Sequence, residues 1–479
     1  MNQHSVEKIG GTSMSDYPAV RDNIIKKHGS DSPYGRVFVV SAYGGITDKL
    51  LEHKKTGQPG IYALFSDSIN DNDWLNQLDA LQHQLLAINS DLFINVERRQ
   101  EANRFIESRI KDVRDCLSNL QTLCQHGHFS ISEHLDTVRE MLASLGEAHS
   151  AWNMAHLLQE DGFNARFVDL TGWDTDKQVC LDERIKAAFE DIDISTELPI
   201  VTGYAHSETG LMSTFDRGYS EMTFSRIAVV TEAAEAIIHK EFHLSSADPR
   251  LVGEGNAVPI GRTNYDVADQ LANLGMEAIH PKAAKGLRQN AIPLRVKNTF
   301  EPEHTGTLIT SDYVSDIPRV EIIAGCKGVY GIELFDQDMA GNISPYDTRV
   351  LAILQRFKTG VIAKDINANT ITHYVSTNLK TVKRIVKALQ EEFTDSEVNQ
   401  QKIAIVSAIG SDMQVPGILA QAVDALAEQD ISVLAMHQSM RQVDMQFILN
   451  EADYDNAIQA LHRRLVEIHD HGQAICLAS

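Results

Sequence analysis

Residues 6–20 read VEKIGGTSMSDYPAV, in which a short apolar strand carries Lys8, ends at Gly10 and Gly11, and leads into a helix. Glycines allow backbone N–H groups to approach an anion closely, and the first turn of a helix presents further N–H groups. The stretch therefore predicts a phosphate site to which Lys8 adds a full positive charge. The alternative is a tight strand-to-helix turn beside a surface lysine, because glycine-rich turns are common.

A second strand and glycine loop follow at residues 36–51, RVFVVSAYGGITDKLL. The run VFVV is apolar and β-branched, which is typical of a strand buried on both faces of a parallel sheet. This strand also ends in a glycine pair, Gly44 and Gly45. Ligands of open α/β sheets bind at the carboxyl ends of the strands. Two successive strands that end in glycine pairs therefore favour a phosphate site over a simple turn.

The rest of the chain divides into an α/β part and a repeat. Strands and helices alternate to about residue 310, with a helical stretch at about 70–160, which predicts a layered α/β domain over residues 1–312. Residues 320–395 and 400–479 each follow the order β-α-β-β-α-β, with VEIIAGC as the opening strand of the first unit. The apolar tail AICLAS could add a last strand. Such ferredoxin-like repeats either sense a ligand or only hold a dimer together.

Composition excludes several classes of partner. The 479 residues include 43 Lys and Arg and 66 Asp and Glu, and the formal net charge of −23 argues against a surface for nucleic acid or anionic lipid. The five cysteines never form CxxC, which disfavours disulfides and zinc-thiolate sites. There is no positively charged leader and no apolar run near the roughly 18 residues of a membrane span. We expect a cytoplasmic protein with no nucleic acid and no membrane partner.

Two closely spaced histidine pairs are candidate metal ligands, HGH at 126–128 and HDH at 469–471. A zinc site needs at least three protein ligands, and neither pair has an obvious third. We expect both pairs to lie in solvated loops and predict no metal site.

Taken in order, the motifs resemble those of aspartate kinases, which belong to the amino acid kinase family and carry two C-terminal ACT domains. The matching segments are KIGGTS at 8–13, VVSAYGGITDKLL at 39–51, LGEAHSA at 145–151, STFDRGYSEMT at 213–223, DPRLV at 248–252, LANLGMEAIHPKAA at 271–284 and IPLRVKNTFEPEHTGTLI at 292–309. The resemblance implies a three-layer, carbamate kinase-like α/β/α sandwich followed by two ferredoxin-like βαββαβ ACT domains.

The family phosphorylates the side-chain carboxylate of L-aspartate with ATP to give 4-phospho-L-aspartate. Transfer between two anions depends on charge neutralisation and alignment. By resemblance, Lys8 stabilises the transferring phosphoryl group and Glu221 holds Lys8. The backbone N–H groups of Gly10, Gly11 and Gly45 contact phosphate, and Mg²⁺ bridges the nucleotide oxygens.

The resemblance also implies how aspartate is held. Arg217 makes a bidentate pair with the α-carboxylate and Glu147 takes the α-ammonium. Hydroxyl groups of Ser41, Thr47 and Ser220 assist. The alternatives are a surface salt bridge for Arg217 and a solvated helix face for Glu147.

Several positions depart from the family pattern. Asp216 and Tyr219 replace glycines, so Tyr219 is expected to add bulk near the substrate, and Glu221 replaces an aspartate. The nucleotide segment aligns with IHKEFH at 238–243, which places His239 and Lys240 near adenine and ribose. Glu277 replaces a lysine, and Lys240 is expected to supply the lost charge. The pattern is similar to aspartate kinases associated with synthesis of ectoine.

For regulation, the resemblance implies a homodimer with threonine or lysine bound where ACT modules of two subunits meet. The expected effector contacts are Gln337, Asp338 and Met339 with Asn367. Two other functions remain open: a non-catalytic amino acid sensor with a decayed kinase domain, and a kinase of the same superfamily with another acceptor, such as glutamate or a nucleotide.

Overall fold

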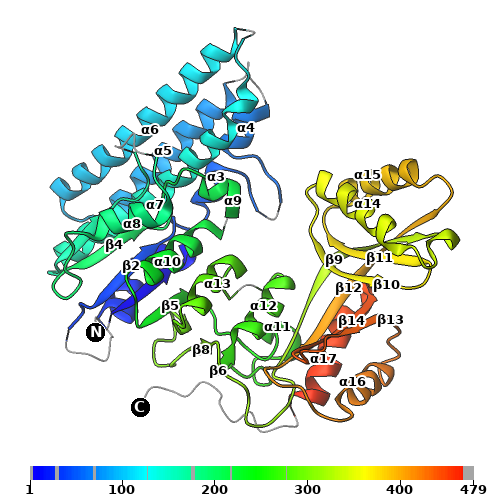
Figure 1. The fold of residues 1–479 in the computed structure, drawn as a ribbon. Coiled ribbons are helices and arrows are strands. Elements are labelled where there is room, and N and C mark those ends of the chain that lie inside the picture. Colours follow the sequence, from blue (N-terminus) through cyan, green and yellow to red (C-terminus); the bar gives the residue numbers. More distant parts are fainter. Residues whose placement is uncertain are drawn as a thin grey trace. The chain divides into compact units, whose positions relative to one another are not determined.

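The computed structural model describes residues 4–26, 32–54, 56–67, 72–126, 128–173, 178–215, 218–276 and 278–467. The chain forms two compact units, the first from residues up to 243 together with 279–310, and the second from 244–278 and the chain beyond 311 (Figure 1). The domain limits expected from the sequence stay a prediction. The tail AICLAS lies outside the described residues. None of the described helices is long and apolar enough to cross a membrane.

The sheet of the first unit runs in the order β3-β4-β2-β1-β5-β7-β8. Its strands are β1 (Ser5–Ile9), β2 (Arg36–Val40), β3 (Ala165–Val168), β4 (Leu198–Thr202), β5 (Glu235–Lys240), β7 (Leu294–Asn298) and β8 (Thr307–Thr310). All neighbours pair in parallel except β7 and β8. Every residue of β2 and β4 is buried, as the apolar runs predict. The carboxyl ends of β1, β2, β4 and β5 therefore meet at one edge.

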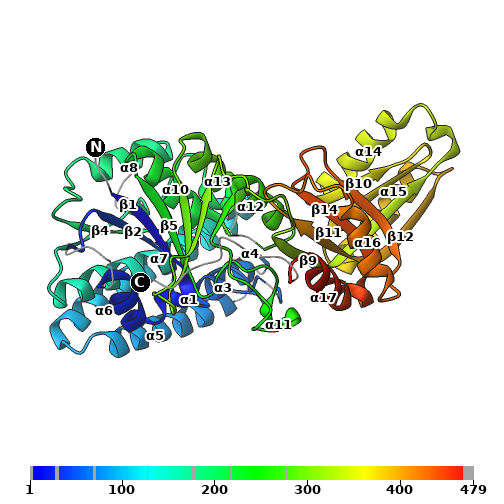
Figure 2. The ribbon, with the colours of Figure 1, turned by 90° about the horizontal axis from the view of Figure 1, so that it is seen from below.

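Helices cover both faces of this sheet (Figure 2). On one face, α10 (Tyr219–Val230) contacts β1, β2 and β5, with α8 (Leu181–Phe189) and α13 (Pro281–Gln289) beside it. On the other face, α7 (Leu135–Glu160) contacts β2, β3 and β4, backed by α6 (Val96–Cys124) and α5 (Asp73–Leu92). The predicted three-layer α/β/α arrangement is confirmed.

The helices of residues 73–160 pack through apolar faces that follow from the spacing of their apolar residues. The buried residues of α5 include Trp74, Leu78, Leu81 and Leu85, which recur every three or four positions and so form one apolar face. The side chain of Asn95 caps α6 by accepting from the N–H groups of the next turn. The shorter elements of the unit are α1 (Gly11–Met14), α2 (Tyr17–Ala19), the π-helical turn η1 (Val20–Ile25), α3 (Ile46–Leu50), α4 (Ile61–Asp67), η2 (Ile131–Glu133) and α9 (Leu211–Phe215).

The second unit contains an antiparallel sheet in the order β10-β11-β9-β12-β14-β13. Its elements are α11 (Pro249–Val252), β6 (Arg262–Asn264), α12 (Tyr265–Asn273), β9 (Ile322–Phe335), η4 (Gln337–Met339), α14 (Ile343–Arg356), β10 (Val361–Ile366), β11 (Thr370–Ser376), α15 (Leu379–Glu392), β12 (Glu397–Ile409), α16 (Ile418–Ala427), β13 (Val433–Gln438), β14 (Asp444–Asn450), η5 (Glu451–Asp453) and α17 (Tyr454–Leu465). The two predicted ACT modules are confirmed, each with two helices on the sheet.

The modules share two long strands, which the sequence did not reveal. The first half of β9, residues 322–326, pairs with 405–409 of β12. Residues 329–335 then pair with β11 in the first module. The prediction therefore placed the opening strand of the first module too early, because one uninterrupted strand serves both modules.

Residues of β1 alternate between the two faces of the sheet. Glu7 is fully buried, and Arg36 of β2 contacts it through two nitrogen atoms at 2.6 and 2.8 Å. His239 Nε2 of β5 lies 2.7 Å from Glu7 Oε2, the oxygen that also accepts from Arg36 Nη2. Burial would raise the pKa of Glu7, but Arg36 and His239 outweigh burial and hold that pKa well below its ordinary range. A cavity of about 340 Å³ adjoins this cluster and is also lined by Arg295, Lys297 and Thr299.

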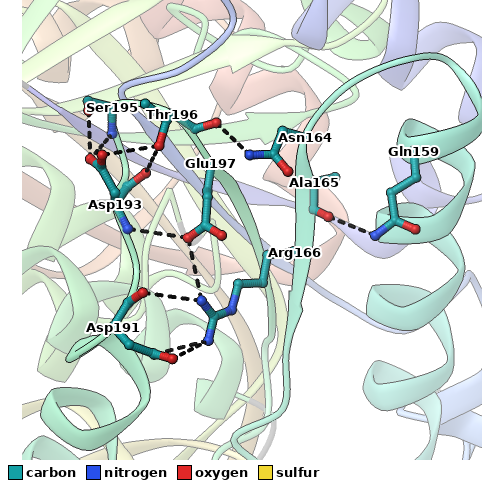
Figure 3. A network of polar contacts seen from close by, with 9 residues as sticks. All are labelled: Gln159, Asn164, Ala165, Arg166, Asp191, Asp193, Ser195, Thr196 and Glu197. Carbon is teal, nitrogen blue, oxygen red and sulfur yellow. Dashed lines mark hydrogen bonds and ion pairs between the residues drawn. The ribbon is translucent and has the colours of Figure 1, made fainter.

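A second polar network lies near the surface, where β3 and β4 begin (Figure 3). Arg166 contacts both carboxylate oxygens of Asp191, at 3.0 and 2.9 Å, and one of Glu197 at 3.5 Å. The Asp191 side chain is 73% exposed, so water screens this pair. The two arginines, Arg36 and Arg166, thus make similar contacts in opposite environments.

We predict that Arg36→Met lowers the free energy of unfolding by about 3–5 kcal/mol, because it leaves Glu7 buried without its counter-charge. Arg166→Met, the control, is expected to cost about 1 kcal/mol or less. The pKa of ionised Glu7 is depressed by its partners Arg36 and His239. Their contribution to the free energy of unfolding is therefore present above about pH 5 and is lost as the pH falls through the acidic range. Urea unfolding at several pH values measures both effects, and equal costs for the two substitutions would contradict this account.

Candidate active site

The first glycine loop lies at the carboxyl end of β1, as expected. Gly10 precedes α1, and its N–H donates to the carbonyl of His239 at 3.2 Å. This bond ties the loop to β5 and occupies the N–H that was expected to contact phosphate. The helix begins at Gly11, and N–H groups in a first helical turn have no partner within the helix. An anion at this loop would therefore meet these groups rather than the N–H of Gly10.

The two glycine loops are in direct contact. A Cβ atom on Gly11 would lie 2.6 Å from the carbonyl oxygen of Ala42, so no side chain fits there. Ser15 Oγ accepts from the N–H of Gly44 at 2.9 Å and donates to the carbonyl of Gly11 at 3.1 Å. Gly45 has φ +79°, a conformation that glycine adopts without strain. The sequence analysis predicted both loops. It did not predict that the side chain of Ser15 would join them by hydrogen bonds.

Lys8 and Glu221 form an ion pair at this edge. Lys8 Nζ lies 3.3 Å from Glu221 Oε1, and both side chains are largely buried. The other carboxylate oxygen accepts from the N–H of His280, which caps α13. Burial would raise the pKa of Glu221, but Lys8, Lys240 and the His280 N–H outweigh burial and lower it. Glu221 is thus ionised, and its extra methylene does not prevent it from reaching Lys8.

Glu147 lies on α7 beside this pair. Its side chain is buried, and Ser220 Oγ donates to Oε1 at 2.6 Å. Burial raises the pKa of Glu147 to about 8, and the Ser220 hydrogen bond and the charge of Lys8 only partly oppose burial. A buried carboxyl in this state is suited to an incoming cation, because a nearby positive charge favours the ionised form.

Two glycines that the sequence analysis did not single out make room for Glu147. A Cβ atom on Gly146 would lie 2.8 Å from the Cβ of Ala42, so α7 approaches the second loop closely. A Cβ atom on Gly203, which follows β4, would lie 2.8 Å from Glu147 Oε2. Their signal in the sequence was weak, because each is a lone glycine outside a repeated motif.

The remaining substrate candidates are placed as follows. The N–H of Ser41 donates to Ile9, and Thr47 is half-buried in α3 after the second loop. Arg217 and Asp216 lie outside the described residues, as does Glu277. Tyr219 is buried and packs edge-on against Tyr204, with ring centroids 5.7 Å apart. Its ring packs in the core and its side chain also contacts the buried Glu147 carboxyl, so the expectation that Tyr219 adds bulk near the substrate stays a prediction.

His239 and Lys240 lie on opposite faces of the sheet. His239 shares the face of Glu7, and its imidazole is buried against that carboxylate. Lys240 lies on the face of Lys8, and its charge helps to lower the pKa of Glu221. The structure therefore brings Lys240 toward the Lys8 group and separates His239 from it. Strand alternation explains the difference, since adjacent residues point to opposite faces.

The expected effector residues lie together in the first ACT module. Gln337 and Asp338 are exposed in η4, while Met339 is fully buried in the core of the module. The N–H of Asp336 donates to the carbonyl of Asn369 at 2.9 Å, which joins η4 to the turn that contains the exposed Asn367. The side chains of Gln337, Asp338 and Asn367 are therefore accessible to an effector, whereas that of Met339 is not.

Comparisons with known proteins identify the family of this chain. Residues 5–298 match the amino acid kinase family, and residues 396–463 match an ACT domain. Aspartate kinase Ask_Ect of Stutzerimonas stutzeri (strain A1501) is 56% identical over 99% of this chain and 100% of its own length. The aspartokinase of Candida albicans is 25% identical over 96% of this chain and 90% of its own.

Solved structures show the same fold. E. coli aspartokinase III in complex with aspartate and ADP superposes with a TM-score of 0.72 at 20% identity, covering 97% of this chain and 100% of that one. The same enzyme with lysine and aspartate gives 0.71 at 18% identity, covering 97% and 99%. The chain belongs to the amino acid kinase family and, within it, to the aspartate kinases.

Proposed function

We propose that this protein transfers the γ-phosphoryl group of ATP to the side-chain carboxylate of L-aspartate. The observation that carries the proposal is the placement of Lys8, paired with ionised Glu221 and next to Glu147, where two glycine loops meet. The 56% identity with Ask_Ect supports aspartate as the acceptor and supports the ectoine-associated branch expected from the sequence.

The chemistry requires alignment and charge, and no general base. A carboxylate oxygen of aspartate attacks the γ-phosphorus, the bond from that phosphorus to the β,γ-bridging oxygen breaks, and ADP leaves with the bonding electrons. The acceptor is already ionised at neutral pH, so no proton has to be removed. Lys8 stabilises negative charge on the phosphoryl oxygens during transfer, and Glu221 keeps the ammonium group in position.

Mg²⁺ completes the charge balance in this proposal. It supplies neutralisation across the phosphate oxygens of the nucleotide and prefers oxygen ligands. The neighbourhood of Lys8 offers oxygen donors, including ionised Glu221 and the hydroxyl of Ser220, which is chemistry that suits a hard cation.

Aspartate is gripped at its amino acid end. We infer that Glu147 binds the α-ammonium, because its buried carboxyl gains a counter-charge when the ammonium arrives. Arg217 takes the α-carboxylate, assisted by Ser41 and Thr47. This arrangement leaves the side-chain carboxylate as the group that faces the γ-phosphate.

The ACT modules are the proposed regulatory part. A homodimer through these modules, with threonine or lysine bound near Gln337, Asp338 and Asn367, fits the exposure of those side chains. Crystals of E. coli aspartokinase III hold lysine, which supports an amino acid effector. Feedback requires that the effector bind one conformation of the enzyme more tightly than another.

The test of the proposed function is an acceptor panel. Purified protein with ATP, Mg²⁺ and hydroxylamine is expected to form a hydroxamate with L-aspartate, and little or none with L-glutamate, because the grip fixes the distance from the α-carbon to the reacting carboxylate. In a third assay, a nucleotide replaces the amino acid as acceptor and the release of ADP is measured. Product from glutamate or a nucleotide alone would replace aspartate as substrate, and failure of all acceptors would favour the sensor alternative.

A pH profile tests the role of Glu147. Its pKa of about 8 means that the carboxyl is mostly neutral below that pH and ionised above it, so kcat/KM for aspartate is expected to rise with pH through about 8. Glu147→Gln should abolish this rise and lower kcat/KM by about 10–100-fold, the cost of one charged hydrogen bond.

Ser220→Ala is the matched control for that profile. The Ser220 hydrogen bond lowers the pKa of Glu147, so its loss should move the rising limb to higher pH without removing it. A limb that persists unchanged in Glu147→Gln would show that another group titrates.

A further inference from the structure

Three potential metal ligands converge beside the sheet of the first unit. His243 lies three residues beyond the end of β5. Glu301 and His304 lie in the connection between β7 and β8. One ligand atom from each residue lies within 4.8 Å of the other two. The sequence analysis considered only histidines that are close in sequence, and therefore missed this group.

Two of the three separations between ligand atoms match those of a metal centre, and the third, between the two histidines, is at most 4.8 Å. His243 Nε2 lies 3.3 Å from Glu301 Oε2, and His304 Nε2 lies 3.4 Å from the same oxygen. A zinc ion with bonds of about 2.0–2.1 Å in tetrahedral geometry separates its ligand atoms by about 3.3–3.4 Å. Charge-assisted hydrogen bonds between nitrogen and a carboxylate are shorter, at about 2.7–2.9 Å. The separations therefore fit a shared ion better than two direct ion pairs.

A neighbouring amide orients the carboxylate. Asn298 Nδ2 donates to Glu301 Oε1 at 2.9 Å, which turns the second oxygen, Oε2, toward the two imidazoles. Hydrogen bonds of this kind to the outer side of a ligand are typical of metal centres.

We propose that His243, Glu301 and His304 bind a divalent transition metal of the zinc class. Two imidazoles and one carboxylate suit Zn²⁺, Co²⁺ or Ni²⁺, whereas Mg²⁺ prefers oxygen ligands. Three protein ligands leave a fourth position for water. The ion would link the end of β5 to the β7–β8 connection. Glu301-x-x-His304 is the sequence signal, and His243 is the distant third ligand.

The experiment is a Zn²⁺ titration of the full-length protein after removal of metals by a chelator. Binding is followed by competition with a chromophoric zinc indicator, and Co²⁺ is used in parallel for the visible spectrum of a tetrahedral centre. The variants are His243→Ala, His304→Ala and Glu301→Gln. The last is nearly isosteric and partly exposed, so it is expected to fold. His128→Ala, at an exposed position outside this cluster, is the control.

The wild type is expected to bind one equivalent of Zn²⁺ with a rise in melting temperature. Each ligand variant should bind at least tenfold more weakly and lose that rise, whereas His128→Ala should behave as the wild type. Melting in chelator checks that each variant folds. Zinc binding that survives all three substitutions, is lost in His128→Ala, or is absent from the wild type would overturn the proposal.

Discussion

The ion pair between Lys8 and Glu221 is the interaction on which the rest of the site depends. It joins the central strand β1 to the first turn of α10, and the second carboxylate oxygen of Glu221 reaches the backbone of His280 at the start of α13. The Lys8 ammonium is thereby fixed at the carboxyl edge of the sheet. Phosphoryl transfer needs a positive charge in a fixed position more than it needs a reactive group, and this packing supplies one.

Adjacent residues of β1 have separate tasks because a strand alternates its faces. Lys8 points to the face of α10, where we propose that it serves the chemistry, while Glu7 points to the opposite face and binds Arg36 and His239. The same alternation separates His239 from Lys240 at the end of β5. Neighbouring residues of the same strand thus contribute to stability and to the proposed site. A shift of one residue in strand register would turn each of these side chains to the opposite face of the sheet.

The sequence predicted features that depend on local pattern, and it missed those that depend on distant packing. The glycine loops, the three layers and the order of ACT elements follow from spacing and were confirmed. The burial of Tyr219 depends on which face of α10 packs inward, and the pairing of His239 with Glu7 depends on which face of the sheet each residue takes. The sharing of β9 between modules and the convergence of His243 with His304 join segments far apart in the chain, for which one sequence carries little signal.

The most direct test of the account is the steady-state kinetics of Lys8→Ala, with Lys111→Ala on the exposed face of α6 as the control. If Lys8 acts on the transferring phosphoryl group, kcat falls by at least about 100-fold while KM for aspartate changes little, because the lost interaction belongs to the transition state. A variant that keeps kcat near the wild-type value, or that changes only KM, would contradict the central role of the Lys8–Glu221 pair.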